Sequence, residues 1–305
     1  MSDTVSDIEL IQDEPAVTDA IRTSGLTKQY GNLLAVDHVD LVVPRGRVLG
    51  IIGPNGAGKT TTFAIIASLL RPTSGRAWVC GHDVDAERYL VRQKLGFMPD
   101  VLGVYDNLQV DEYLHFFASS YRVPRRERPA LIDGLLELVD LQTKRHAMVD
   151  SLSRGMKQRL SLARALVHDP EVLILDEPAS GLDPRARVEL RELVAELHAM
   201  GKTIVISSHI LADLEEMCSD VAIMETGRLL ASGPPREILE TLGATRTIEV
   251  RFADGTLETF TATTDADQHA LLKRLLAEGR EVVDFHQTSG GLEDVFLAVT
   301  EGKVQ

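Results

Sequence analysis

A glycine-rich segment between an apolar run and a helical pattern constrains this chain more than any other feature. Residues 53–60 read GPNGAGKT; they follow the apolar run Val48–Ile52 and precede the helical run Thr61–Leu70. Glycines let the backbone turn its N–H groups inward, and a helix start adds partial positive charge, so such a loop suits phosphate oxygens. The lysine can reach terminal phosphates and the next threonine can offer a hydroxyl to Mg²⁺. We therefore predict a phosphate site formed by Gly53, Pro54, Asn55, Gly56, Ala57, Gly58, Lys59, Thr60 and Thr61.

The alternation of strand-like and helix-like stretches predicts the fold class. From Ile21 to about Leu242, short β-branched runs alternate with amphipathic stretches, which is typical of βαβ units and a mainly parallel sheet covered on both faces. Between about residues 92 and 165 the strand signal fades and apolar residues recur at helical spacing, so we expect a helical insert there. Three runs are apolar enough to be buried strands: Val48–Ile52, Val172–Leu175 and Thr203–Ser207.

The two ends of the chain differ from this central part. Residues 1–20 carry six acidic and no basic side chains, and we expect a disordered, solvated tail. Gly233-Pro234-Pro235 interrupts the regular pattern, and we expect a short helix after it, through Leu242. In residues 243–305, apolar and polar side chains then alternate on either side of the turn signal Asp254-Gly255. This pattern predicts a small accessory α+β domain with a hairpin, helices at about 267–278 and 292–299, and a strand at 281–286.

Composition limits the classes of function. Lys and Arg total 32 against 46 Asp and Glu, a formal charge of −14, and so acidic a surface repels a phosphodiester backbone. We therefore expect no nucleic-acid partner. The two cysteines, Cys80 and Cys218, are too few for a disulfide scaffold and fit a reducing interior. This cysteine content makes the cytosol the expected compartment. No apolar stretch reaches the roughly 18 residues that a spanning helix needs.

Two carboxylates and a histidine follow buried strands at positions that suit hydrolysis. Val172–Leu175 ends in Asp176 and Glu177, and acids at the mouth of a buried strand are costly unless they have a role. We predict that Asp176 holds Mg²⁺ and that Glu177 orients or deprotonates an attacking water. His209 lies just beyond Thr203–Ser207 and could hydrogen-bond a terminal phosphate or that water.

A second anion site is predicted at a helix start. Leu152-Ser153-Arg154-Gly155-Met156 precedes the helical run from Lys157 to His168, and Ser153 is well placed in its N-cap region. The Ser153 hydroxyl and the Gly155 N–H could therefore bind an anion. A capped helix without a ligand is the plainer interpretation of the same residues.

Five segments, taken in order, resemble the ATP-binding cassette of ABC transporters. They are the phosphate loop, LSRGM at 152–156, the strand ending in Asp-Glu at 172–177, Ser180-Gly181-Leu182-Asp183 and a switch histidine at 209. The resemblance covers about residues 21–242 and implies an α/β P-loop NTPase fold with a mixed sheet core. It also implies ATP hydrolysis with ATP and Mg²⁺ as cofactors, and adenine stacking on Tyr30.

The family implies a head-to-tail homodimer in which ATP is part of the interface. By this resemblance, ATP held by Lys59 of one subunit would be closed over by Ser153 and Gly155 of the other, and Asp183 would lie at the interface and couple the two sites. Because no spanning segment is seen, the resemblance also implies a separate transmembrane permease. The dimer would then bind the cytoplasmic face of the cell membrane, with Val101–Tyr105 as an apolar floor for docking.

Two places depart from the family pattern. Arg154-Gly155-Met156 stands where Gly-Gly-Gln is usual, and Asp100 stands where Gln is usual. The Asp100 carboxylate can still ligate Mg²⁺, but it cannot donate the hydrogen bond that an amide donates. We therefore expect hydrolysis to persist with altered coupling.

Several short segments indicate which group of ABC proteins the chain resembles. Residues 97–100, 155–159 and 291–297 resemble ATPase subunits of the ABC-2 type group, which mostly exports drugs, antibiotics, polysaccharides or lipids, so an exporter is expected. Two alternatives stay open. A non-transport ABC ATPase acting on ribosomes or DNA is disfavoured because neither a second cassette nor a long coiled-coil interruption is seen. A regulatory ATP clamp without turnover is disfavoured by Glu177 and His209.

Overall fold

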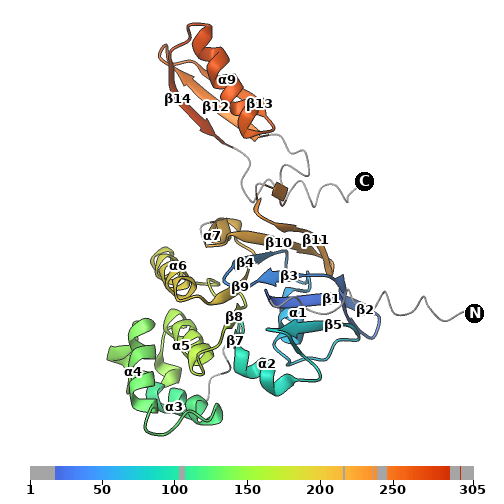
Figure 1. The fold of residues 1–305 in the computed structure, drawn as a ribbon. Coiled ribbons are helices and arrows are strands. Elements are labelled where there is room, and N and C mark those ends of the chain that lie inside the picture. The colour runs from blue at the N-terminus through green and yellow to red at the C-terminus, as the bar shows by residue number, and fades with distance from the viewer. Residues whose placement is uncertain are drawn as a thin grey trace, which may run out of the picture.

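The computed structural model describes residues 18–101, 103, 107–215, 217–235, 237–238, 246–288 and 296. Its centre is a six-stranded sheet in the order β11-β10-β4-β9-β8-β7 (Figure 1), in which every neighbouring pair is parallel except β10 and β11. The three strands predicted as buried are neighbours in this sheet, which confirms them. The bounds are β4 (Val48–Ile52), β7 (Leu95–Met98), β8 (Val172–Leu175), β9 (Thr203–Ser208), β10 (Asp220–Glu225) and β11 (Arg228–Gly233).

Both faces of this sheet are buried, which explains why its central strands are apolar along their length. Successive side chains of a strand point to opposite faces. Along β8, Leu173 and Leu175 pack into one core cluster, while Val172 and Ile174 pack into another. The first cluster also contains residues of four helices, α3 (Val110–Ser120), α4 (Arg128–Leu138), α5 (Arg154–Leu166) and α6 (Pro184–Ala199), and the second contains residues of α1 (Lys59–Ile66) and of a second sheet.

The second sheet is antiparallel, which the sequence pattern did not predict. Its order is β2-β1-β5-β6, and β3 also pairs with β1. β1 starts at Asp19, and Ala20 is fully buried. The predicted tail of 1–20 is therefore wrong at its last two residues, while residues 1–17 lie outside the described part. The bounds are β1 (Asp19–Tyr30), β2 (Leu33–Val39), β3 (Val42–Pro44), β5 (Ser74–Val79) and β6 (His82–Asp83).

The predicted helical insert contains one strand of the central sheet. Leu95–Met98 forms β7, which pairs with β8, so the prediction of helices from about 92 was wrong at this strand. Four apolar residues are too few to show a strand period beside longer helical runs. None of the helices in the described part of the chain is long and apolar enough to cross a membrane. The helices are α1 (Lys59–Ile66), α2 (Arg88–Lys94), α3 (Val110–Ser120), α4 (Arg128–Leu138), α5 (Arg154–Leu166), α6 (Pro184–Ala199) and α7 (Leu211–Glu215), with 3₁₀ turns at Gln142–Lys144 and Val149–Ser151.

The C-terminal residues form a third sheet with one helix, as the alternation predicted. Its order is β13-β12-β14, and both pairings are antiparallel. Ile248, Val250 and Leu275 lie in its small core. The predicted helix at 292–299 lies outside the described residues except for Phe296, and the short helix predicted before residue 243 lies largely outside them. The bounds are β12 (Arg246–Phe252), β13 (Leu257–Ala262), α9 (Asp265–Ala277) and β14 (Val282–Gln287).

A half-buried histidine, His168, joins the ends of α3 and α5 and makes stability depend on pH. The His168 ring stacks on Tyr121 at 3.8 Å between centroids, and its Nε2 lies 3.1 Å from the Leu95 carbonyl oxygen. Burial lowers the pKa of His168 from 6.5 to about 4. The hydrogen bond with the Leu95 carbonyl raises this pKa and only partly offsets the effect of burial. As pH falls from 6.5 to 4, the unfolded chain takes up a proton that the folded chain does not, so the folded state loses stability across that window.

We expect the free energy of unfolding to fall by up to about 3 kcal/mol more in the wild type than in His168→Gln between pH 6.5 and pH 4. The amide can still donate to Leu95 but does not titrate. Urea unfolding at a series of pH values measures the difference, with His269→Gln, an exposed position on α9, as the matched control. Parallel curves for wild type and His168→Gln would contradict this assignment.

Candidate functional site

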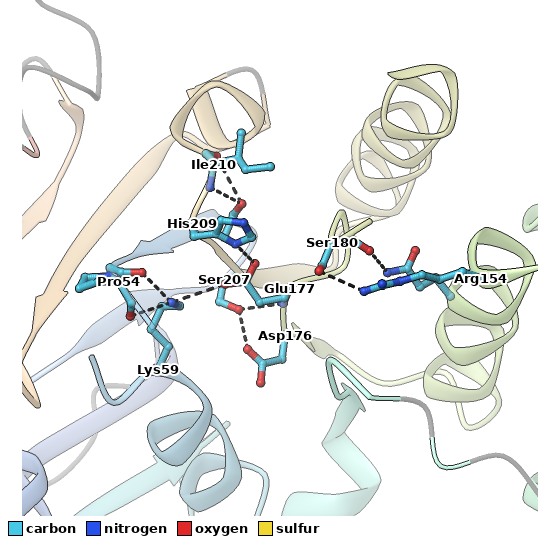
Figure 2. A network of polar contacts seen from close by, with 12 residues as sticks. Pro54, Lys59, Arg154, Asp176, Glu177, Ser180, Ser207, His209 and Ile210 are labelled. Atoms are coloured by element: carbon cyan, nitrogen blue, oxygen red, sulfur yellow. Dashed lines mark hydrogen bonds and ion pairs between the residues drawn. The ribbon is translucent and has the colours of Figure 1, made fainter. Parts of the chain in front are cut away.

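The predicted phosphate loop, carboxylates and histidine meet at one edge of the central sheet. The segments after β4, β8 and β9 carry them, and these strands are parallel neighbours. The carboxyl ends of parallel strands lie at the same edge, which is where open α/β sheets bind ligands. Figure 2 shows Lys59, Asp176, Glu177 and His209 converging around Ser207.

The phosphate loop depends on glycine at two positions for different reasons. Gly58 is the N-cap of α1 with φ 101°, a conformation that side chains disfavour. A Cβ on Gly53 would lie 2.2 Å from the Met224 carbonyl oxygen, so only glycine fits against β10 there. The loop thus leads directly from the end of β4 into the start of α1, as its sequence predicted.

Lys59 lies inside the loop and joins it to the carboxylate strand. Its side chain is 6% exposed, and its Nζ donates to the carbonyl oxygens of Gly53 at 2.6 Å and Pro54 at 3.3 Å. The same Nζ lies 3.5 Å from Glu177 Oε1. A buried ammonium held in this way can contact an anion in the loop without leaving its position.

Asp176 is fully buried beneath the cleft. The Ser207 hydroxyl donates to its Oδ1 at 2.6 Å, whereas its Oδ2 has no hydrogen-bond partner among the described residues. Burial raises the pKa of Asp176; the Ser207 and Thr60 hydroxyls oppose this shift, and the neighbouring carboxylates of Glu177 and Asp100 add to it. A buried carboxylate oxygen without a partner suits a cation.

Glu177 is held in an unusual backbone conformation beside His209. Its φ is 50°, in the left-handed region, and its N–H donates to the Ser207 hydroxyl at 2.8 Å. Its Oε2 lies 2.7 Å from His209 Nδ1. Strained backbone of this kind is kept only where surrounding contacts fix it. The carboxylate is therefore oriented on one side by the imidazole and on the other by Lys59, as a general base would need to be.

The cleft above these groups is lined by both sheets. Tyr30, from the end of β1, lines it and is 47% exposed, and the Lys28 ammonium lies 5.2 Å from the centre of its ring. Leu33 and Ala35 of β2 line it too and were not predicted, because nothing in the sequence marks them as near the loop. The full lining is Tyr30, Leu33, Ala35, residues 54–61, Asp100 and Glu177.

Six predicted site residues do not line this cleft in the described part of the subunit. Gly53, Asp176 and His209 belong to the hydrogen-bonded groups beside it, whereas Ser153, Gly155 and Asp183 are not part of those groups. Ser153 is the N-cap of α5, as predicted, and its Oγ accepts from the Met156 N–H at 3.3 Å. Asp183 is the N-cap of α6, and its Oδ1 accepts from the Ala186 N–H at 2.9 Å. Both side chains are exposed, so their surfaces are open to contact from outside the subunit.

Sequence reasoning missed the polar contacts that two residues, Ser207 and Arg154, make in and beside the site. Ser207 joins Asp176 to the Glu177 backbone, and a buried serine at the end of an apolar strand is the signal that could have revealed it. Arg154 of α5 donates to the Ser180 hydroxyl at 3.2 Å. No sequence signal marks that pair, because the two residues are 26 positions apart.

Comparison with known proteins agrees with this geometry. The family model described as ABC transporter matches residues 36–180. Nod factor export ATP-binding protein I of Burkholderia lata is 36% identical over 293 residues, which cover 91% of this chain and 96% of that protein. An ATP-binding subunit of an ABC transporter shares 31% identity with a TM-score of 0.68, covering 73% of this chain and 93% of that chain.

A dimeric bacterial ABC transporter cassette is also similar. It shares 25% identity with a TM-score of 0.65, and the match covers 70% of this chain and 98% of that one. These matches confirm the fold class and the family predicted from the sequence. The chain belongs to the ATP-binding proteins of the ABC transporter family, and it is an ATP-hydrolysing subunit of such a transporter.

Proposed function

We propose that this chain binds ATP in the cleft above β4, β8 and β9 and hydrolyses it to power export through a separate membrane permease. The observation that supports this best is the convergence of Lys59, Asp176, Glu177 and His209 at one sheet edge. In this proposal the loop residues 53–61 hold the phosphates, and Tyr30 stacks on the adenine.

Magnesium fits the corner of the cleft beside Asp176. The orphaned Asp176 Oδ2 is buried, and the Thr60 hydroxyl and Asp100 carboxylate are neighbouring oxygen donors. Mg²⁺ prefers one or two carboxylates together with substrate phosphates. Asp176, Thr60 and Asp100 would hold the ion, which when bound neutralises charge on the phosphates.

Glu177 is the proposed general base. A water attacks the terminal phosphorus, its proton passes to Glu177, and ADP leaves with the bond to the terminal phosphate broken. His209, 2.7 Å from the carboxylate, fixes the orientation of Glu177 and can contact the phosphate. Lys59 binds the developing charge on the phosphate oxygens.

The second half of each site is proposed to come from another copy of the chain. Ser153 and Gly155 start a helix whose N–H groups can bind an anion, yet they do not line the cleft described above. The related dimeric cassette supports a pair of subunits. We propose a head-to-tail homodimer, in which Ser153 and Gly155 close over the ATP held by the partner's loop, with Asp183 at the interface.

The remaining assignments follow from the family and from relatives. We divide the chain into a cassette from about residue 19 to 242, with a helical insert after β7, and an accessory module from 243 to 305. The name of one relative includes the word export, which supports the proposal that this chain serves an exporter. The permease would hold the dimer at the cytoplasmic face of the membrane.

Affinity purification from detergent-solubilised membranes tests this function. Tagged Glu177→Gln protein, kept with ATP and Mg²⁺, should retain an integral membrane protein through washing, whereas Lys59→Ala protein should retain less. Recovery of ribosomes or DNA with either variant, and of no membrane protein, would favour the non-transport alternative instead.

Asp100 gives a second test of the magnesium site. Asp100→Gln removes one of the carboxylates near Asp176, so we expect the Mg²⁺ concentration for half-maximal ATP turnover to rise several-fold. Asp100→Asn, which removes the charge but keeps the length, should behave alike if charge is the cause. Unchanged turnover and unchanged Mg²⁺ dependence in both variants would exclude a direct role for Asp100.

A further inference from the structure

Arg154, which stands where the family usually has glycine, packs its guanidinium on a neighbouring loop. Figure 2 shows the side chain extending from the start of α5 toward Ser180. Its Nη2 donates to the Ser180 Oγ at 3.2 Å. A Cβ on Gly181, whose φ is 70°, would lie 2.6 Å from the Arg154 Cζ, so the missing side chain at 181 makes room for the guanidinium.

A second side chain of α5 holds the same residue. Gln158, one turn further along the helix and 9% exposed, donates from its Nε2 to the Ser180 carbonyl oxygen at 2.9 Å. Ser180 is therefore bound to α5 through its side chain by Arg154 and through its backbone by Gln158. Residues four apart on a helix lie on one face, which is why both can reach a single partner.

Ser180 is in turn bonded to the backbone of the proposed base. The Ser180 N–H donates to the Glu177 carbonyl oxygen at 3.0 Å and closes the turn of residues 177–180. Glu177 is the residue with φ 50° in that turn. Such a conformation persists only where neighbouring contacts fix it. A chain of two hydrogen bonds thus runs from Arg154 through Ser180 to the backbone of Glu177.

We infer that Arg154 is a positioning residue for Glu177 of its own subunit. The inference rests on the proposed function, because it takes Glu177 as the base and the start of α5 as the surface that closes over the partner's ATP. When α5 closes over the partner's ATP, the position of α5 is passed through the Arg154–Ser180 contact to Glu177. Glu177 acts on the ATP that its own subunit's loop holds. The rival role is direct contact of the Arg154 guanidinium with the partner's triphosphate.

Mixed dimers with a single working base separate the two roles. Full-length subunits with different affinity tags are paired, and one of them carries Glu177→Gln, so that only the other subunit's base can work. In the same-subunit arm, Arg154→Ala is placed in the subunit with the intact base. In the opposite-subunit arm, it is placed in the subunit with Glu177→Gln. The reference pair has no change at Arg154.

We expect kcat in the same-subunit arm to fall by about tenfold to a hundredfold with little change in KM, since a misplaced group loses about this much. The opposite-subunit arm should match the reference pair. A loss confined to the opposite-subunit arm would show direct contact with the partner's ATP and would overturn the inference. Equal losses in both arms, or no loss in either arm, would also overturn it.

Two further variants keep the test independent of folding. In the subunit with the intact base, Ser180→Ala removes the hydroxyl acceptor and should reproduce the loss in kcat, while Arg154→Lys, which can still donate once, should recover part of it. Normal turnover with Ser180→Ala would refute the inference. A reference pair without turnover that also fails to bind ATP would refute the proposed function itself, and the inference with it.

Discussion

Glu177→Gln is expected to lower ATP turnover by about 10²–10⁴-fold, the size of effect that a positioned general base contributes. The amide keeps the shape of the side chain but cannot accept the proton of the attacking water. Because the carboxylate lies beside Lys59 and His209 and not in the glycine loop, ATP binding should persist. Phosphate release under saturating ATP and equilibrium binding of a fluorescent ATP analogue measure the two properties separately.

Glu196→Gln is the matched control for this substitution. Glu196 is an exposed residue of α6, and the same chemical change there should leave turnover within about twofold of the wild type, as for most surface substitutions. Turnover by Glu177→Gln at the wild-type rate would mean that another group takes the proton, and the assignment of the base would then be wrong.

Lys59→Ala is expected to weaken ATP binding by about tenfold to a hundredfold, since one hydrogen bond to a charged group contributes about 1.5–3 kcal/mol. Turnover should be lost at ATP concentrations that saturate the wild type. The Gly53 and Pro54 carbonyl oxygens hold the Lys59 ammonium within the loop, so alanine also removes a contact that shapes the loop. Nucleotide titration measures the affinity, and circular dichroism checks the fold.

Lys273→Ala, at an exposed position on α9, controls for the loss of one positive charge from an acidic protein. It should bind ATP like the wild type. If Lys59→Ala bound ATP with wild-type affinity, the loop would not hold the triphosphate through this side chain. The assignment of the triphosphate site to the loop would then be wrong.

The sequence was most informative where a side chain's role depends on its immediate neighbours. The loop at 53–60 could be placed because its pattern fixes the backbone and because a buried strand precedes it. Asp176 and Glu177 could be placed because an apolar strand ends in two acids. The parallel pairing of β4, β9 and β8 then brings these segments together by geometry, which made the centre of the site predictable.

Contacts between distant segments could not be predicted in this way. β7 is only four residues long and gains its stability from pairing with β8, so its own sequence carries little signal. Arg154 is a departure from the family pattern, and only the structure shows its guanidinium beside Gly181. Ser207 likewise acquires its role because Asp176 and Glu177 directly follow the adjacent strand, β8.

Complementation between inactive subunits tests the central claim most directly. Lys59→Ala disables the loop. Ser153→Glu places a negative charge where the partner's triphosphate would bind, and a glutamate is tolerated at the start of a helix. Each variant alone should be inactive. In a head-to-tail pair of the two, one site keeps both an intact loop and an intact helix start.

The account predicts that mixing the two inactive proteins in equal amounts restores roughly a quarter of wild-type turnover, because half of random pairs are mixed and each has one intact site. Glu177→Gln added to the Lys59→Ala subunit should leave this activity unchanged, since that subunit's own site is already disabled. A mixture that remains as inactive as its two components would contradict the shared site.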